Sequence, residues 1–386
     1  MSKPENTYDV AVIGAGVFGA WTALMLQRSG RKVTLIDQYG AGNSRSSSGG
    51  ESRIIRMGYG DDEIYTRSAQ RSLNHWLTFA RETGEPILHR TGVLWLAHRE
   101  DPYCTKTFET LSRLGVPIEQ LTSGEVAARF PQLSNLDVEW AMLETDSGAL
   151  MARRAVQAVA RKAISEGVSY FQEQVKLPES LDKNSTLTCS SGMKLAAENF
   201  VFACGPWLPK LFPDLLAERI VPSRQEVYFF GAGENAKAYS GQALPIWIDF
   251  KNEAYGFPDL ESRGVKIAID RHGPLFDPDS GDRVVTSAGI VEVRQYVARR
   301  VPGLANAAIT ETRVCQYENT SNGDFLIDRH PDHSNVWLVG GGSGHGFKHG
   351  PTVGEYMVAR LDDNGEGLEP RFSLASKFTT QQRAVF

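Results

Sequence analysis

The 386-residue sequence lacks the features that mark several large classes of protein. It has no excess of basic residues: 41 Lys and Arg stand against 46 Asp and Glu, for a net charge of -5 and a pI of about 6.0. Nucleic-acid binding needs a basic footprint, so no nucleic-acid partner is expected. No apolar run approaches the roughly 20 residues of a membrane span. The polar first residues lead directly into a strand-like run, so neither a secretory signal nor a membrane partner is expected.

Cysteine is also scarce. The four cysteines lie far apart and without the spacing of metal ligands: Cys104, Cys189, Cys204 and Cys315. This pattern fits a reducing cytoplasm better than a disulfide scaffold, and it predicts no metal site. Internal repeats and heptads are missing too. What remains is an ordinary globular composition, with 41% hydrophobic and 23% charged residues, in a chain long enough for two or three domain-sized units.

The first 37 residues carry the clearest local signal. Tyr8–Ile13 is a short apolar run typical of a strand, Ala20–Arg28 favours a helix with an apolar face, and Lys32–Asp37 predicts a second strand. Gly30 ends the helix. The segment is therefore predicted to be a βαβ unit.

Between the first strand and the helix, Gly14, Gly16 and Gly19 form a GxGxxG motif. These glycines permit a tight turn, close backbone approach to a pyrophosphate and close packing of helix on strand. The helix N-terminus offers N–H groups to the phosphates, and Asp37, 18 residues after Gly19, can bind a ribose hydroxyl. The unit predicts dinucleotide binding; its N-terminal position favours FAD over NAD.

The rest of the chain predicts a mixed fold. A Gly- and Ser-rich stretch at 40–60 directly follows the second strand, which favours a loop around a ligand over a linker. Further helices are expected at 65–83, 151–166 and 352–361, and strands at 92–97, 199–203, 325–328 and 336–340, with several antiparallel strands between 224 and 270. The expected class is α/β, with the first and last parts of the chain building one nucleotide-binding unit.

A series of separated motifs makes the prediction more specific. In chain order they are Gly50–Arg56, Tyr255–Pro258, Gly264–Lys266, Val314–Tyr317, Phe325–Pro331 and Gly342–Lys348. From about residue 8 to about residue 360 the sequence resembles the monomeric sarcosine oxidase family of flavoproteins, which includes N-methyltryptophan, pipecolate and fructosyl-amine oxidases. The resemblance implies a Rossmann-type FAD-binding domain (1–85, 145–220 and 313–386) interleaved with an antiparallel-sheet substrate domain with an α+β fold (86–144 and 221–312).

Two residues acquire chemical roles through this resemblance. A lone cysteine is usually a small core residue, but Cys315 matches the family's cysteine that holds the flavin through its 8α-methyl carbon. Covalent attachment needs a thiolate, which cationic neighbours such as Arg313 can favour. Lys266 matches a lysine that lies over the flavin and assists reaction with oxygen by stabilising developing negative charge. The alternative for Lys266 is a solvated lysine on an edge strand.

The resemblance also implies a substrate site. Arg56 and Lys348 match residues that bind the substrate carboxylate, which suits a guanidinium fork and a point charge; the alternative is phosphate contact or surface charge. Arg53 matches an arginine near the flavin ring. Tyr255 and Tyr317 match aromatic residues lining the site, although buried tyrosines are more often core residues.

The Gly-rich run near the flavin contributes two further candidates. Gly344 is predicted to contact the cofactor, because backbone N–H groups there could support a reduced, anionic ring. His345 is a candidate catalytic residue, with a purely structural histidine as the alternative.

The sequence departs from the family at its expected substrate pocket. Asp270 stands where the sarcosine oxidases have a histidine four positions after the lysine, and Ser48 and Gly49 replace histidines ahead of the Gly-x-x-Arg motif. An acid facing the substrate suits a bulkier molecule with a hydroxyl or a second amine, so sarcosine is not the expected substrate. The alternative is that Asp270 points at Arg271 or solvent.

We therefore expect a monomeric, cytoplasmic FAD-dependent oxidase that converts a secondary (N-alkyl or cyclic) amino acid or related amine to an imine, with oxygen as acceptor and hydrogen peroxide as product. Three alternatives stay open: a dehydrogenase with another electron acceptor, an enzyme of sugar-modified or cyclic amines, and a flavin-binding subunit without turnover.

Overall fold

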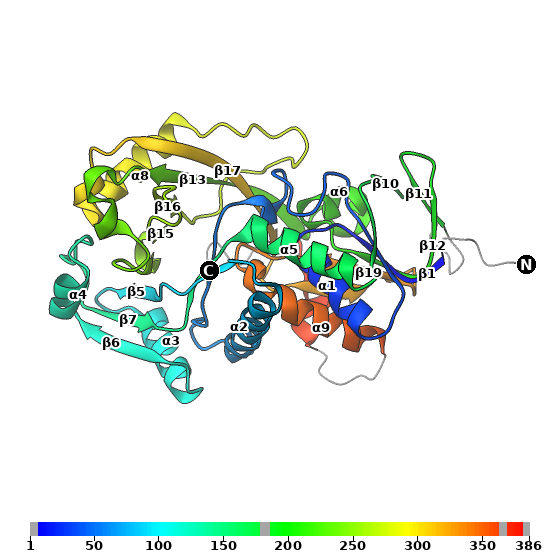
Figure 1. Ribbon diagram of the computed structural model, residues 1–386, viewed down its shortest axis with the longest axis horizontal. Helices are drawn as coiled ribbons and strands as arrows, with labels where there is room; N and C mark the ends of the chain where they lie inside the picture. The colour runs from blue at the N-terminus through cyan, green and yellow to red at the C-terminus, as the bar shows by residue number, and fades with distance from the viewer. Residues whose placement is uncertain (1–6, 178–185, 363–368, 381–386) are drawn as a thin grey trace, which may run out of the picture.

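The computed structural model describes residues 7–177, 186–362 and 369–380; the remaining parts of the predicted domain ranges lie outside the described residues. Two eight-stranded sheets form its two halves (Figure 1). The first sheet contains the predicted βαβ unit, whose strands pair in parallel. Its strands run in the order β10 (Val175–Lys176), β11 (Thr186–Cys189), β12 (Lys194–Phe202), β1 (Thr7–Ile13), β2 (Val33–Ile36) and β9 (Ser169–Phe171), with β19 (Val336–Gly340) paired to β12 and to β18 (Leu326–Arg329).

Three helices pack together on this sheet: α1 (Val17–Arg28), α5 (Ala152–Ser165) and α9 (Gly350–Leu361). The first helix begins three residues before its predicted start, because Gly16 caps it directly after the glycine turn. Strands β1 and β2 are apolar and buried, as expected where helices cover a parallel sheet. The α/β class is therefore as the sequence predicted.

The second sheet is antiparallel except for one parallel pair, β14 with β5. Its order is β17 (Ile309–Thr320), β13 (Ile220–Phe230), β16 (Val265–Ile269), β15 (Ala254–Phe257), β14 (Ile246–Asp249), β5 (Val93–Ala97), β7 (Trp140–Glu144) and β6 (Ile118–Thr122). Strand β17 crosses the domain boundary predicted at residue 313 and pairs along β13. It thereby carries residues of the second sheet toward the nucleotide-binding half.

The stretch predicted as a loop at 40–60 contains one short strand, β3 (Arg53–Ile55), which forms a small third sheet with β8 (Gly148–Leu150) and β4 (Leu88–His89). The other α-helices are α2 (Glu63–Thr83), α3 (Pro102–Arg113), α4 (Ser123–Arg129), α6 (Leu208–Leu211), α7 (Pro213–Leu216) and α8 (Ser287–Arg300). Within the described ranges, no helix has the length and apolar character needed to cross a membrane.

Candidate active site

The glycine turn is built as the motif predicts. Gly14 has φ +100°, and a Cβ added there would lie 2.4 Å from the carbonyl oxygen of Ala203. A Cβ at Gly19 would lie 1.8 Å from the oxygen of Gly14. Both positions therefore require glycine: the first for its left-handed φ and close contact, the second for the close approach of helix to turn.

Asp37 closes this turn. Its carboxylate accepts hydrogen bonds from the N–H groups of Ala15, at 2.7 Å, and Tyr39, at 2.8 Å. Burial raises the pKa of Asp37, although these N–H donors oppose the shift. The acid thus fixes the loop and lines the same cavity as Gly14 and Gly16.

A cavity of about 440 Å³ opens beside the turn. Its walls come from the turn, the end of β2, the loop at 46–48, residues 202–207, strand β17 at 316–318 and the Gly-rich run at 342–347. The Ser47 hydroxyl, buried in this wall, has no hydrogen-bond partner within the described residues. An elongated ligand rich in polar groups would satisfy such an atom. The cavity, the glycine turn and the helix N-terminus therefore fit FAD.

A smaller cavity of about 70 Å³ adjoins the first, and Arg53, Tyr317 and Gly344 line both. The structure brings together in its wall every residue predicted to bind substrate or act in catalysis, together with the predicted flavin tether: Arg53, Arg56, Tyr255, Lys266, Asp270, Cys315, Tyr317, His345 and Lys348. These residues come from β3 and the residue after it, from strands β15 to β17 of the second sheet and the residue after β16, and from the Gly-rich run. Their convergence is a property of the fold, because they are spread over almost 300 positions from 53 to 348.

Cys315 is buried in the wall of the smaller cavity. A guanidinium nitrogen of Arg53 lies 3.2 Å from its sulfur and donates to it. Arg313, the cation that the sequence suggested as its neighbour, donates instead to the Glu51 carboxylate and to the Gly49 carbonyl. Arg53 is therefore the cation in direct contact with the thiol, in a position to stabilise a thiolate.

Lys266 is not a solvated edge lysine. Strand β16 lies between β13 and β15, and the side chain is only 3% exposed. Its Nζ donates to the carbonyl of Ser52, at 2.9 Å, and lies 4.2 Å from the ring centre of Phe257. Burial, and then the charge of Arg53, lower the pKa of Lys266 well below its usual range.

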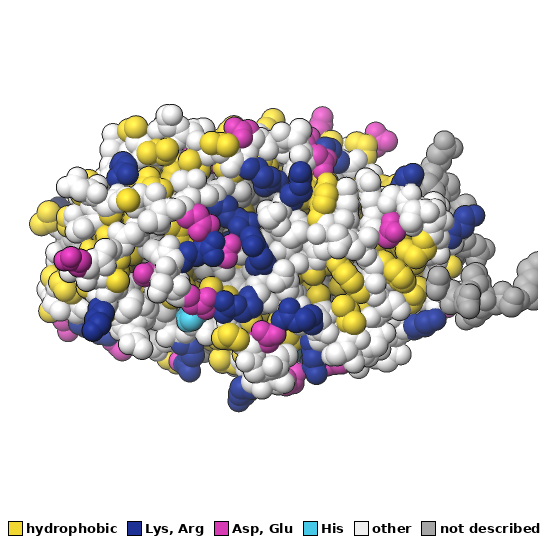
Figure 2. Space-filling model, turned by 45° about the horizontal axis from the view of Figure 1, so that its top comes forward, with side chains coloured by type: hydrophobic (Ala, Val, Ile, Leu, Met, Phe, Trp, Pro, Cys, Tyr) yellow, Lys and Arg dark blue, Asp and Glu magenta, His cyan; other side chains and the backbone are white. Residues whose placement is uncertain are grey.

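Ion pairs hold the loop that carries Ser52. Arg153, Arg263 and Arg313 all pair with Glu51, and Arg153 and Arg313 also donate to the Gly49 carbonyl. Basic side chains gather near the middle of the face shown in Figure 2. Three arginines from different segments converge on Glu51 of this loop, and such a network fixes a segment better than an isolated surface pair.

Arg56 and Lys348 are buried cations of the smaller cavity. The guanidinium of Arg56 lies over the rings of Tyr59, at 4.6 Å, and Trp95, at 4.9 Å. Lys348 donates to the carbonyl of His345 at 2.9 Å, and burial, followed by the charge of Arg56, lowers its pKa well below the usual range. Within the described residues neither cation forms an ion pair, and Glu144 and Asp270 act on Lys348 without pairing with it, so an anionic ligand would provide a direct partner.

Asp270 faces the same cavity and not its neighbour in the chain. Its carboxylate accepts a 2.6 Å hydrogen bond from the Tyr317 hydroxyl, whereas Arg271 pairs with Glu253 and Glu292. Burial raises the pKa of Asp270 to about 6, against the opposing effects of the Tyr317 hydrogen bond and the Arg56 charge. The smaller cavity thus places one acid among four cationic side chains, Arg53, Arg56, Lys266 and Lys348.

The comparison with known families agrees with this geometry: the profile described as FAD dependent oxidoreductase matches residues 9–360. The chain belongs to this family. Peroxisomal sarcosine oxidase of Mus musculus is 31% identical to it, with 100% of both chains aligned. Monomeric sarcosine oxidase of Bacillus sp. (strain B-0618) is 29% identical over 91% of each chain. Among solved structures, L-proline dehydrogenase from P. horikoshii matches with a TM-score of 0.83 and 25% identity, covering 96% of this chain and 98% of that one.

Membership of the FAD dependent oxidoreductases favours an enzyme over the alternative of a binding subunit without turnover. It also confirms the resemblance to sarcosine oxidases on which the roles of the site residues were predicted. Those roles themselves stay predictions.

His345 of this oxidoreductase is tied to protein groups through both ring nitrogens. Its Nε2 lies 3.0 Å from the Gly323 carbonyl, and its Nδ1 lies 3.1 Å from the Tyr59 hydroxyl. A carbonyl only accepts, so Nε2 carries the hydrogen and Nδ1 accepts from Tyr59. The Tyr59 oxygen then accepts from His349 Nε2 at 2.8 Å. This geometry supports the structural alternative for the His345 ring, while its carbonyl holds Lys348.

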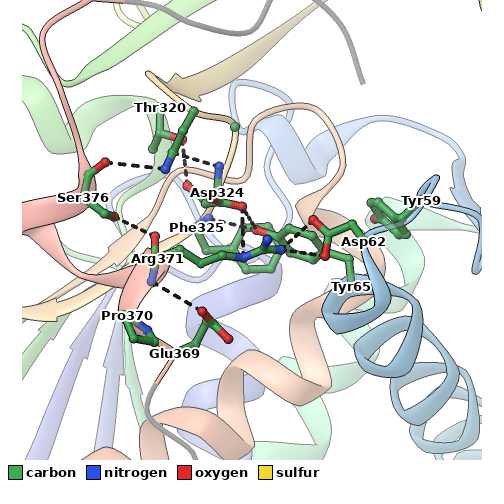
Figure 3. A network of polar contacts seen from close by, with 12 residues as sticks. Tyr59, Asp62, Tyr65, Thr320, Asp324, Phe325, Glu369, Pro370, Arg371 and Ser376 are labelled. Atoms are coloured by element: carbon green, nitrogen blue, oxygen red, sulfur yellow. Dashed lines mark hydrogen bonds and ion pairs between the residues drawn. The ribbon is translucent and has the colours of Figure 1, made fainter. Parts of the chain in front are cut away.

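A network of polar contacts lies next to Tyr59 and supports its position (Figure 3). Arg371 donates to both carboxylate oxygens of Asp62, at 2.8 and 2.6 Å, and lies beside Asp324, which accepts from the Tyr65 hydroxyl at 3.0 Å. The Tyr65 ring packs against Tyr59, with 5.2 Å between ring centroids. The last described segment of the chain is thereby fastened to α2 and supports the wall that carries Lys348.

Sequence reasoning missed several residues of the site. Ser52 and Tyr59 lie in or just after the Gly50–Arg56 motif, but only the contacts with Lys266 and His345 reveal their parts. Glu318 follows Tyr317 on β17 and lines the larger cavity. A single acid in a strand gives no signal by itself, because its surroundings come from distant segments.

Proposed function

We propose that the protein oxidises a secondary amino acid, or a related amine that carries a carboxylate, to an imine, with oxygen as the electron acceptor and hydrogen peroxide as the product. The observation that carries the proposal is the pair Arg56 and Lys348, two buried cations without an ion-pair partner in the described residues, beside the expected flavin tether. A carboxylate on the substrate would neutralise them and orient the molecule. The names of the sarcosine oxidase relatives support the amine class.

When bound, FAD would supply the two-electron chemistry of this reaction, as acceptor of a hydride from the carbon next to nitrogen and as donor of electrons to oxygen. We propose that Gly14, Gly16, Gly19, Asp37 and Gly344 contact FAD and that the Cys315 sulfur holds it covalently. The contact between Arg53 and Cys315 supports the link, because the guanidinium stabilises the thiolate that must react.

The protein residues then bind, orient and exclude water. Arg56 and Lys348 would hold the carboxylate, and Tyr255, Tyr317 and Asp270 would surround the amine end. A buried site that already holds several cations disfavours a charged ammonium, so the amine would react in its neutral form and no general base is required. Lys266 would stabilise negative charge that develops as oxygen is reduced.

A second candidate has support of its own: a dehydrogenase that passes electrons to another acceptor. The solved L-proline dehydrogenase covers 96% of this chain at a TM-score of 0.83. A Lys266→Met variant separates the two. If the protein is an oxidase, reoxidation of the variant's flavin by oxygen should slow about 100-fold while anaerobic reduction by substrate persists. If the unmodified protein and the variant are reoxidised equally slowly by oxygen, but turn over fast with an artificial acceptor, the protein is a dehydrogenase.

The main test is anaerobic mixing with N-methyl and cyclic amino acids, each paired with the amine that lacks the carboxylate. The expected result is bleaching of the flavin absorbance by at least one carboxylate-bearing amine and far weaker bleaching by its partner. If dithionite bleaches the flavin but no amine does, the proposed reaction is wrong. If both members of each pair act equally, the role of Arg56 and Lys348 is wrong.

We further propose the predicted division into an FAD-binding and a substrate domain, and a monomer in the cytoplasm. The two sheets and the position of β17 between them support the division. All four cysteines are free, which supports a reducing compartment.

A further inference from the structure

Glu318 is a buried acid that the proposed reaction does not use. It lies on β17, lines the larger cavity and is 8% exposed. Its Oε1 accepts the N–H of Gly342 at 3.1 Å, whereas its buried Oε2 has no hydrogen-bond partner within the described residues. A buried carboxyl oxygen without a partner is costly, so a group that enters the cavity and donates to it would be favoured.

Glycines surround this carboxyl group on the cavity side. A Cβ at Gly342 would lie 3.2 Å from Oε1, and one at Gly340 would lie 3.3 Å from Oε2. Gly205 is next, at 3.6 Å from Oε2 and with φ +55°. Larger residues at these positions would crowd or cover the acid. The three glycines leave room beside the acid, which lines the cavity although Oε2 itself is buried.

The position of Glu318 indicates which part of FAD it meets. It lies three residues after Cys315 on one strand, about 10 Å along β17. On its other side, Gly342 packs toward Phe18 in the first turn of α1, 3.9 Å from a Cβ built at Gly342. The ring would be held at Cys315 and the pyrophosphate at the N-terminus of α1. Between these two parts, FAD has its hydroxyl-bearing ribityl chain.

Charge points to the same part of the cofactor. A carboxylate repels the pyrophosphate, whereas a hydroxyl can donate to the carboxylate or accept from the protonated acid. Burial raises the pKa of Glu318 to about 7, against the opposing effects of the Gly342 and Gly341 N–H groups, so both forms exist near neutral pH and either can bond a hydroxyl.

We propose that Glu318 Oε2 hydrogen-bonds a ribityl hydroxyl of FAD, which makes Glu318 a cofactor-binding residue. Without FAD, the buried and unpartnered oxygen would destabilise the fold. The proposal rests on FAD as the cofactor of this family and not on the amine substrate. It predicts opposite effects of one substitution: Glu318→Leu should bind FAD more weakly and yet be more stable as the apoprotein. An acid with a merely structural role would lower both.

The test uses the full-length chain with Cys315→Ser, so that FAD binds reversibly, and adds Glu318→Leu or, as an isosteric control, Glu318→Gln. Dissociation constants are measured for FAD by fluorescence quenching and for ADP by calorimetry, and apoprotein melting by circular dichroism. ADP carries the adenosine and pyrophosphate but has neither ribityl chain nor ring. We expect Glu318→Leu to weaken FAD about 10- to 100-fold, to leave ADP within about twofold and to raise the apoprotein melting temperature. Glu318→Gln should stay within a few-fold of the parent for FAD.

Three results would overturn the proposal: an unchanged FAD affinity in Glu318→Leu, an equal loss for ADP and FAD, or a lower apoprotein melting temperature with a parallel loss of FAD. Should the leucine variant fail to fold, Glu318→Ala removes the same hydrogen bond and gives the same readings. Failure of the proposed amine oxidation would leave all these affinities unchanged, so the two proposals are tested separately.

Discussion

The two adjoining cavities differ in what recognises the ligand. The larger cavity is lined by glycines, hydroxyls and apolar side chains, and of the four acids in its wall, Asp37, Glu173, Asp279 and Glu318, only Glu318 is buried. The smaller one concentrates charged side chains, with Arg53, Arg56, Lys266 and Lys348 around a single acid, Asp270. Backbone N–H groups and a helix N-terminus suit a dinucleotide. Fixed charges suit a small ionised molecule that must be oriented.

Cysteine substitutions should separate the two cavities most clearly, because Cys204 lines the larger cavity and Cys315 lines the smaller one. Cys204 lines the larger cavity, and burial, with Asp37 and Glu318 nearby, raises its pKa. Cys315 accepts from Arg53. We predict that Cys315→Ala abolishes covalent flavin while Cys204→Ala retains it, because only Cys315 has a cation to stabilise its thiolate. Acid precipitation followed by absorbance of pellet and supernatant measures this. Yellow supernatant from the unmodified protein would contradict the covalent link and leave FAD binding intact.

The next largest effect should come from Arg56. Arg56→Met removes one of two cations that face the carboxylate, and loss of a buried charged partner costs roughly 3 kcal/mol, or about 100-fold in affinity. Anaerobic titration of the flavin spectrum with a carboxylate-bearing ligand measures the dissociation constant. Flavin content should not change, because Arg56 lines only the smaller cavity. A loss of FAD equal to the loss of ligand would show that the two cavities are not separate in function.

Asp270 should give the smaller cavity a pH dependence near its pKa of about 6. Above that pH the anion can accept a hydrogen bond from the substrate amine, so kcat/KM should rise by about tenfold as pH increases through 6. Asp270→Asn should lack this rise. For stability the sign is opposite: the raised pKa means that the folded chain holds the proton more tightly than the unfolded chain, so this contribution is lost as pH rises from about 4 to 6. Identical pH profiles in both proteins would exclude Asp270 from the substrate end of the site.

The same contrast explains how much could be predicted from the sequence. The nucleotide-binding turn is local: Gly14, Gly19 and Asp37 occur within one βαβ unit, so their spacing alone predicts the turn that the structure shows. The smaller cavity is not local, and its residues were placed only through resemblance to a family. The contact partners of individual side chains could not be predicted for either cavity. The contact of Cys315 with Arg53 instead of Arg313, and the place of Glu318 among glycines in the wall of the larger cavity, depend on how β17 lies between the two halves.

The smallest effect should come from the network of Arg371, Asp62 and Asp324, next to the smaller cavity. Arg371→Met leaves Asp62 and Asp324 without their shared cation, so we expect a loss on the order of 1–2 kcal/mol in the free energy of unfolding. The matched control is Arg67→Met: Arg67 pairs with Glu63 one turn away on the exposed face of α2, and such pairs contribute less than about 0.5 kcal/mol. Thermal unfolding of both variants measures the difference, and ligand affinity should change little in either. Equal melting temperatures would mean that the network of Figure 3 holds the last described segment without stabilising the fold. A large loss of ligand affinity in Arg371→Met alone would instead show that the position of Lys348 depends on this network. The smaller cavity would then be more easily disturbed than the larger one.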